Sequence, residues 1–347
     1  MLKRWYDLGY RIKFIVSGSS NLSILRGTSE ALVGRINPQI VLPMKFTEYI
    51  RFREGDSIAD AINAANSSMR QALQTAVKAH NPRLFYDSVK AVAKDLAPLK
   101  DKILVYLNQY LIKGGYPEIA KIDDTSECTQ NLRNYLNLTI YKDIMRTGKV
   151  RDPVALESLF AMLAKESSQV VNRFNLARTL GLKRETLNTY IYLLKSAFLV
   201  SEAETYSKSR AKRIRREKKV YVNDVGIRNA SCALLDDQTL TIADEMGKVA
   251  ETVSADHSRR LRLDFDPSYN LQAMYWREKY EVDFIIELFN KSLPVEVKYR
   301  EQIRGLQGLE DFNSMVKPPL SIVITKDYMD IQEPNVFIPM WQYLTVC

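Results

Sequence analysis

The sequence predicts a multidomain protein that combines α/β units with an all-α part. Its 347 residues are about two to three times the length of one typical domain, and 46% of them are apolar, which suffices for several cores. Strand-like apolar runs lie near both ends, whereas residues 56–121 contain few Gly or Pro and are predicted to be helical. Helices and strands alternate again after Asp244, which indicates a second α/β unit at the carboxyl end.

The first part of the chain has the pattern of the end of an α/β unit. Residues 13–16 are predicted to be a short buried strand, which a polar turn at residues 17–21 ends. A helix follows, and residues 39–42 are predicted to be a second strand before Pro43. Because a strand–helix unit closes this early, the chain is expected to lack the front of that unit.

A compact helical block is predicted over residues 131–200. Residues 172–182 and 183–194 are expected to form two short helices joined at Gly181, which is the pattern of a helix-turn-helix. In the second helix, Arg184 and Asn188 lie on the outward face and are candidates for phosphate or base contacts. The alternative is that the helix pair only packs two domains together.

A strongly basic run follows this block. Residues 208–219 contain eight Lys or Arg and one acid, Glu217, so most of the excess charge of the chain lies there. Residues 198–200 and 219–222 are predicted to be two strands of a wing with the basic run at its tip. Such a run is often only a solvated loop, but beside a helix-turn-helix it favours duplex DNA. The candidate contacts in the run are Lys208, Arg210, Lys212, Arg213, Arg215 and Arg216.

The most informative segment is a predicted hairpin of residues 281–287 and 294–298, joined by residues 290–292. Strand side chains alternate between faces, so Glu296 and Lys298 share one face, and pairing of the strands brings Asp283 beside them. Two carboxylates and an amine can bind Mg²⁺ or Mn²⁺ and activate water for phosphodiester hydrolysis. The alternative is a solvated hairpin with a surface salt bridge.

The remaining composition excludes several classes of site. Two histidines and three scattered cysteines exclude a histidine-rich zinc centre and a cysteine cluster, so any metal ion is expected to have oxygen ligands. The three scattered cysteines fit a reducing, cytoplasmic setting. The absence of a long apolar run or a leader pattern predicts a soluble, unprocessed protein without a membrane partner.

Taken in order, several short motifs resemble one family. The motifs lie at residues 17–20, 32–35, 42–49, 114–118, 220–226 and 247–251, with Asp283, Glu296 and Lys298 last. Each motif is weak alone, but their order covers nearly the whole chain. In this order the chain resembles archaeal and bacterial ATP-binding proteins with an AAA-type (STAND-like) ATPase domain and a C-terminal DUF4143 region.

The resemblance implies four units. Residues 1–55 would be the rear part of a P-loop ATPase core, and residues 56–125 a helical lid. Residues 126–225 would hold the winged helix, and residues 226–347 a domain similar to PD-(D/E)XK nucleases. In the ATPase part, Ser19, Asn21 and Arg35 would belong to a nucleotide site. In the nuclease-like part, Glu251 would join Asp283 and Glu296 as a third metal ligand, and Lys298 would act on the attacking water.

The chain also departs from the family, because it contains neither a G-x-x-x-x-G-K-[ST] motif nor an apolar strand ending in paired acids before residue 17. ATP hydrolysis by this chain alone is therefore not expected. The leading hypothesis is a DNA-binding protein with a Mg²⁺-dependent nuclease-like domain. The alternatives are a non-catalytic module that binds nucleic acid or a protein partner, in one or several copies, and an ATPase whose front part lies upstream.

Overall fold

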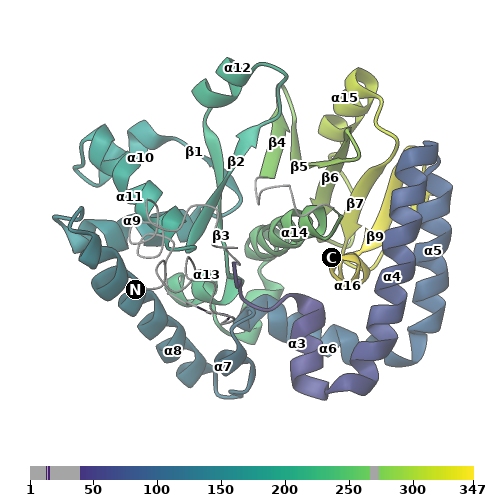
Figure 1. Cartoon of the computed structure of the whole chain (residues 1–347), viewed down its shortest axis with the longest axis horizontal. Helices are drawn as coiled ribbons and strands as arrows, with labels where there is room; N and C mark the ends of the chain where they lie inside the picture. Colours follow the sequence, from purple (N-terminus) through teal and green to yellow (C-terminus); the bar gives the residue numbers. More distant parts are fainter. Residues whose placement is uncertain (1–12, 14, 16–39, 266–272) are drawn as a thin grey trace.

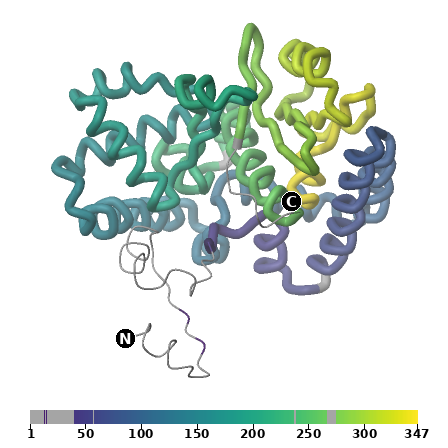
Figure 2. Tube along the Cα trace, turned by 45° about the horizontal axis from the view of Figure 1, so that its top comes forward, coloured from purple at the N-terminus to yellow at the C-terminus, as the bar shows by residue number. Residues whose placement is uncertain are grey.

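The computed structural model describes residues 13, 15, 40–265 and 273–347 of the chain. Its first helices form a group at one side of the molecule (Figures 1 and 2). Asn81 caps the second helix of the long pair by accepting the Arg83 N–H, and Pro82 occupies the first helical position. The group comprises α3 (Phe46–Glu54), α4 (Asp56–Ala79), α5 (Pro82–Asp95), the short η1 (Ala97–Leu99), α6 (Lys100–Lys113) and α7 (Pro117–Ala120).

A second helical group lies on the opposite side of the molecule (Figure 2). Asp152 and Asn172 cap its helices α9 and α10 with their side-chain oxygens, and Gly181 ends the turn after α10 in the left-handed region at φ 62°. The two short helices predicted over residues 172–182 and 183–194 are therefore confirmed as α10 and α11. The group comprises α8 (Thr125–Asn137), η2 (Leu138–Ile144), η3 (Met145–Thr147), α9 (Pro153–Lys165), α10 (Arg173–Thr179) and α11 (Arg184–Ser196).

One mixed sheet runs between the two helical groups. Its strand order is β1-β3-β2-β4-β5-β6-β7-β9-β8, and β2 pairs with β4 in parallel although about seventy residues separate them. The strands are β1 (Gln169–Val171), β2 (Val200–Thr205), β3 (Lys218–Val222), β4 (Ala273–Arg277), β5 (Glu281–Leu288), β6 (Lys291–Lys298), β7 (Ser321–Thr325), β8 (Asp330–Gln332) and β9 (Asn335–Pro339).

The remaining helices connect and cover the sheet. The long α14 (Ala243–Phe265) crosses one face together with α16 (Met340–Val346), and α15 (Gln307–Val316) covers the other face (Figure 1). The first helical group holds the carboxyl end, since Arg70 donates to the Val346 carbonyl at 2.7 Å. The short α12 (Arg210–Arg215), α13 (Val225–Ser231) and η4 (Asp237–Thr241) complete the described elements.

Strand β3 divides two apolar cores. Val220 and Val222 pack with the second helical group, while Tyr221 faces the core under α14. Residues at alternate positions of a strand point to opposite faces, so Lys219 shares the α14 face with Tyr221. This position of Lys219 is important for the site described below.

Several sequence predictions need correction. Residues 40–42 form no strand, and Val41 is 94% exposed. The strand expected at residues 198–200 runs instead from Val200 to Thr205, because Phe198 adopts a positive φ of 57° after α11. The basic run is not an extended wing tip but contains the short helix α12, which Ser209 caps. The strands β8 and β9 and helix α16 were not expected at all.

The predicted hairpin is confirmed as β5 and β6, with a tighter connection than expected. Residues 291 and 292 already belong to β6, and the turn consists of Phe289 and Asn290, with φ of 52° and 61°. Two consecutive left-handed residues are typical of a type I′ turn, whose twist matches that of the strands it joins. The Phe289 ring packs on Phe265 of α14 at a centroid distance of 5.3 Å, which anchors the turn to the helix.

Candidate functional site

Acidic side chains from α14 and β5 surround one buried lysine. The Lys219 Nζ lies 2.7 Å from Glu251 Oε1, 2.6 Å from Glu281 Oε1 and 3.4 Å from Asp283 Oδ1. Its side chain is only 1% exposed. The Tyr221 hydroxyl donates to the same Glu251 oxygen at 3.1 Å, so that carboxylate is held from two positions on β3.

Lys219 reaches these acids from three strands away in the sheet. Ala203 of β2 is its direct partner in the ladder, and that small, fully buried side chain leaves space for the lysine to cross the strand. The Nζ then lies 5.9 Å from the ring centroid of Tyr275 in β4, a favourable cation–π distance. The route depends on the parallel pairing of β2 with β4, which brings β3 near β5.

Asp283 and Glu296 face each other where β5 and β6 separate. The regular ladder ends at the Phe284–Val295 pair. Beyond it, Asp283 Oδ2 accepts the Val297 N–H at 2.8 Å, and Glu296 Oε2 accepts the Asp283 N–H at 3.3 Å. Side-chain carboxylates thus replace the backbone acceptors that the separated strands no longer provide.

The predicted relation between Glu296 and Lys298 is confirmed. The Lys298 Nζ lies 2.6 Å from Glu296 Oε1, so the two side chains share one face of β6. Together with Asp283, they form a second group of charges beside the one around Lys219. The two groups share Asp283, and all four predicted residues of the site therefore lie near one another, with Glu251 joined through Lys219.

A β-bulge directs the acids of β5 toward α14. The pairing of β4 with β5 shifts by one residue between Met274 and Trp276. As a result, Val282 packs in the core on the α15 side, although strict alternation would place it with Phe284 on the other side. Bulges of this kind re-aim side chains next to functional positions, and this one brings Glu281 to Lys219.

Burial and neighbouring charges shift the pKa values of the side chains in this site. Burial, and then the negative charge of Asp283, raise the pKa of Glu251 to about 8, and the same two causes raise the pKa of Glu296 to about 8. Burial acts to lower the pKa of Lys219, but the surrounding carboxylates outweigh it and raise that pKa well above its usual value. An ion pair alone would lower the pKa of Glu251, so burial and Asp283 dominate there.

The arrangement as it stands does not fit a divalent cation. Mg²⁺ requires carboxylate oxygens at about 2.0–2.1 Å around one point, whereas the oxygens of Glu251 and Asp283 here converge on the Lys219 ammonium. Glu296 is directed to Lys298 and to a backbone N–H. In the described ranges, no group of three or more Asp, Glu, His or Cys side chains is arranged to hold a metal ion.

Sequence reasoning missed Lys219, Glu281 and Tyr221 as parts of this site. Lys219 was considered only as the last residue of the basic run and as the first residue of the predicted strand 219–222. The available signal was the alternation of residues 219–222, which places Lys219 with Tyr221 and apart from the two valines. The partner acids of Lys219 depend on the pairing of distant strands, which no local pattern reveals.

Residues 208–216 of the basic run form a largely exposed surface between β2 and β3. Lys208, Arg210 and Arg215 are exposed, and among the described residues they form no ion pair. Lys212 and Arg216 both approach Glu278 in the β4–β5 turn, at 2.9 and 3.6 Å. An open hollow of about 490 Å³ lies along this side of α12, and it is lined by Ser209, Ala211, Lys212, Arg215 and Arg216.

The two candidate DNA-contact residues of α11 differ in their exposure to solvent. Arg184 is exposed at the first position of α11. The side chain of Asn188 is half-buried and accepts a hydrogen bond from Arg173 at 2.8 Å. Arg173 also binds Glu202 of β2, so Asn188 belongs to a network that fixes α11 to the sheet. Arg213, a candidate from the basic run, is half-buried, and its backbone carbonyl accepts a hydrogen bond from the Lys218 ammonium.

Three motifs of the family resemblance meet at one junction. Gly115 donates its N–H to Asp224 at 2.8 Å and accepts the Met44 N–H at 2.7 Å. A Cβ on Gly114 would overlap the Asp224 carboxylate, so glycine is required there. Burial raises the pKa of Asp224 to about 6. The motifs at residues 42–49, 114–118 and 220–226 therefore serve close packing between distant segments.

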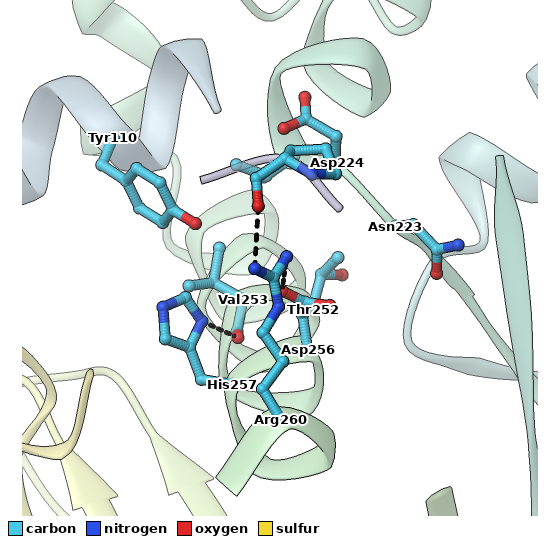
Figure 3. A pocket seen from close by; sticks show the side chains of 10 residues that line it. Tyr110, Asn223, Asp224, Thr252, Val253, Asp256, His257 and Arg260 are labelled. Carbon is cyan, nitrogen blue, oxygen red and sulfur yellow. Dashed lines mark hydrogen bonds and ion pairs between the residues drawn. The ribbon is translucent and has the colours of Figure 1, made fainter. Parts of the chain in front are cut away.

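The junction borders a small cavity of about 10 Å³ (Figure 3). Arg260 of α14 donates to the Pro43 carbonyl at 2.8 Å and pairs with Asp256 at 2.7 Å. His257 Nδ1 binds the Val253 carbonyl at 2.9 Å, and its Nε2 accepts the Phe46 N–H at 3.1 Å. Burial lowers the pKa of His257 to about 4, so the ring is neutral. This agrees with a structural role for the histidine.

The predicted nucleotide-site residues Ser19, Asn21 and Arg35 lie outside the described residues. In the parts of the chain that are described, no helix is long and apolar enough to cross a membrane.

Two family models match parts of the chain. Residues 105–239 match a domain of unknown function (DUF8612), and residues 246–343 match a domain of unknown function (DUF4143). The predicted DUF4143 region is thereby confirmed. Lys219 lies in the first matched region, whereas Glu251, Glu281 and Asp283 lie in the second. The buried charge cluster therefore joins the two.

The relatives of the chain are distant. An uncharacterized protein of Methanocaldococcus jannaschii is 26% identical over 304 residues, which are 86% of this chain and 57% of that protein. An uncharacterized protein of Mycobacterium tuberculosis is 25% identical over 54% of this chain and 42% of its own length. The chain thus spans about half the length of these curated relatives. No solved structure matches it.

Proposed function

We propose that this protein binds duplex DNA through the unit from α9 to β3, and that its acidic cluster supports the structure without cleaving DNA. The observation that carries the proposal is the exposed basic surface of α12 and its flanks, placed between two strands that follow a helix-turn-helix. The order helix, strand, two helices and two strands, with the sheet order β1-β3-β2, supports a winged helix.

The carboxyl-terminal part supports a nuclease-like ancestry. The order α14, three antiparallel strands β4–β6, helix α15 and parallel strand β7 agrees with the fold that the resemblance implies. Asp283 and the Glu296–Lys298 pair lie on the second and third strands. Their oxygens are bound to ammonium groups and backbone N–H groups, however, and this favours a binding module over a working nuclease.

Charge neutralisation tests the DNA contact. We expect the double variant Arg210→Gln/Arg215→Gln to bind a labelled duplex more weakly, because two phosphate contacts are lost. The slope of log K against log salt, measured by fluorescence anisotropy, should decrease by about 2. The matched control Lys90→Gln/Lys94→Gln removes two exposed charges from α5 and should leave binding close to that of the wild type. Equal effects of both variants would contradict the assigned surface.

A plasmid assay tests the absence of cleavage. Supercoiled DNA incubated with the wild type and Mg²⁺ or Mn²⁺ is expected to remain intact. If the wild type cleaves and Asp283→Ala does not, the cluster is a nuclease site and the non-cleaving role is wrong. Cleavage that persists in Asp283→Ala and Glu296→Ala would come from another protein in the preparation.

A further inference from the structure

Lys219 occupies the place in the acidic cluster where oxygen ligands converge. Carboxylates from two different elements direct an oxygen at its Nζ at 2.6, 2.7 and 3.4 Å. Convergence of carboxylates from separate elements on one point is how proteins bind a hard cation. Here the cation is a side chain of the same protein, and it is 1% exposed.

The residues around the Lys219 ammonium hold it in place among the carboxylates. Tyr221 holds Glu251 from the same strand, Ala203 provides the space for the lysine stem, and the Tyr275 ring lies against the charge. A divalent ion on the same oxygens would lie a few ångströms from the ammonium in a buried place, where repulsion between like charges is strong. The two cations therefore compete for one position.

The local charge shows why a cation is needed there. Four carboxyl groups, from Glu251, Glu281, Asp283 and Glu296, face the two ammonium groups of Lys219 and Lys298. Because burial raises the pKa of Glu251 and of Glu296 to about 8, the charged acids at neutral pH are chiefly Glu281 and Asp283, which balance the two ammonium groups. Without Lys219, one ammonium group would remain for two carboxylates. Removal of one partner from such a buried network leaves charge without compensation.

We propose that Lys219 is a built-in counter-ion that replaces a divalent cation at the Glu251–Asp283 position and keeps such ions out. The site then binds a divalent metal only when this ammonium is removed. The proposal deepens the non-cleaving role proposed above, since it names the group that blocks the metal. It concerns metal binding alone and is independent of DNA contact.

The test compares Mn²⁺ binding by the full-length wild type and by the Lys219→Met variant, which lacks the ammonium. Binding is measured by calorimetry and by the electron paramagnetic resonance signal of free Mn²⁺. We expect no stoichiometric binding to the wild type or to Lys218→Met, the neighbouring control. Lys219→Met should bind one Mn²⁺ with an affinity at least about tenfold higher than that of the wild type. The double variant Lys219→Met/Asp283→Asn should lose that site. Added Mn²⁺ should also raise the melting temperature of Lys219→Met selectively.

Two outcomes would overturn the proposal. One is stoichiometric Mn²⁺ binding by the wild type that is abolished in Asp283→Asn. This outcome can be observed even if no variant at Lys219 folds. The other is a folded Lys219→Met protein, shown by its circular dichroism, that binds Mn²⁺ no better than the wild type. Duplex binding measured in EDTA reports separately on the proposed DNA contact, so failure of one claim is distinguishable from failure of the other.

Discussion

Glu296 is a carboxyl group whose folded environment favours its protonated form. Burial and the charge of Asp283 raise its pKa from 4.5 to about 8. The folded state therefore binds more protons than the unfolded state between these values, and the contribution of Glu296 to stability decreases as pH rises through this window. Below pH 4.5 that contribution is fully present.

The variant Glu296→Gln should remove this dependence, because the amide has the shape of the protonated acid and carries no charge. At pH 5 we expect its melting temperature to be close to that of the wild type. At pH 9 it should be higher, by about 3 °C or more, as differential scanning fluorimetry can measure. Glu287→Gln on the same hairpin is the control and should show no such pH-dependent gain. If Glu296→Gln were less stable than the wild type at pH 9, the ion pair of Glu296 with Lys298 would outweigh the cost of burying the charged carboxylate.

At the residue scale, the predictable part of the site was the part encoded by short spacing. Glu296 and Lys298 stand two apart in a strand, so their common face follows from alternation, and the opposing position of Asp283 follows from the hairpin. The role of Lys219 did not follow, since its neighbours in sequence are basic and its acidic partners lie more than thirty residues away. The network around Asn188 was missed because Arg173 and Glu202 reach it only through the packing of α10 and β2 beside α11.

At the scale of elements, the β5–β6 turn shows how a local conformation sets the register of the site. Asn290 has a φ of 61°, in the region that asparagine tolerates and β-branched residues avoid. The turn fixes which residues of β5 and β6 are opposite, and hence the approach of Asp283 to Glu296. The turn is thus part of the machinery that assembles the acids.

We expect Asn290→Val to destabilise the protein by about 1–2 kcal/mol, because a β-branched residue is strained in the left-handed region. Urea denaturation followed by circular dichroism measures this change. Asn290→Gly is the matched control and should be close to the wild type or slightly more stable, since glycine adopts this conformation freely. Equal stability of both variants would mean that the turn relaxes to another type without cost.

Most helices could be predicted because each carries its own signals. Asn172 and Gly181 bracket α10, and Asn81 with Pro82 begins α5. The bulge in β5 was not predictable, because it arises from how β4 and β5 pair and leaves no mark in the sequence of either strand. The helix α12 was missed because a run of like charges resembles a solvated loop.

At the scale of the whole molecule, the two regions matched by family models share one sheet. The parallel pairing of β2 with β4 and the Lys219 cluster connect them by backbone hydrogen bonds and by buried charge. The family resemblance implied separate units at residues 126–225 and 226–347. The sequence held no sign of this pairing, since strand partners far apart in a chain are set by the assembled core.

We expect the chain to unfold in one cooperative transition. In a Trp5→Phe background, the fluorescence of Trp276 and Trp341 reports on the carboxyl-terminal region, whereas the circular dichroism signal is dominated by helices of both regions. In urea, the two signals should give the same midpoint and slope, as for a two-state protein. Separate midpoints would show that the two regions unfold independently despite the shared sheet.

The continuous sheet also bears on self-association. The stretch of β4 at residues 273–277 is rich in apolar side chains, and β2 covers one of its edges. If β2 were lost, by proteolysis or by loosening of the second helical group, that edge would present unpaired N–H and C=O groups to other chains. Open apolar edges are templates for intermolecular strand pairing. By covering this edge of β4, strand β2 thus also limits intermolecular strand pairing.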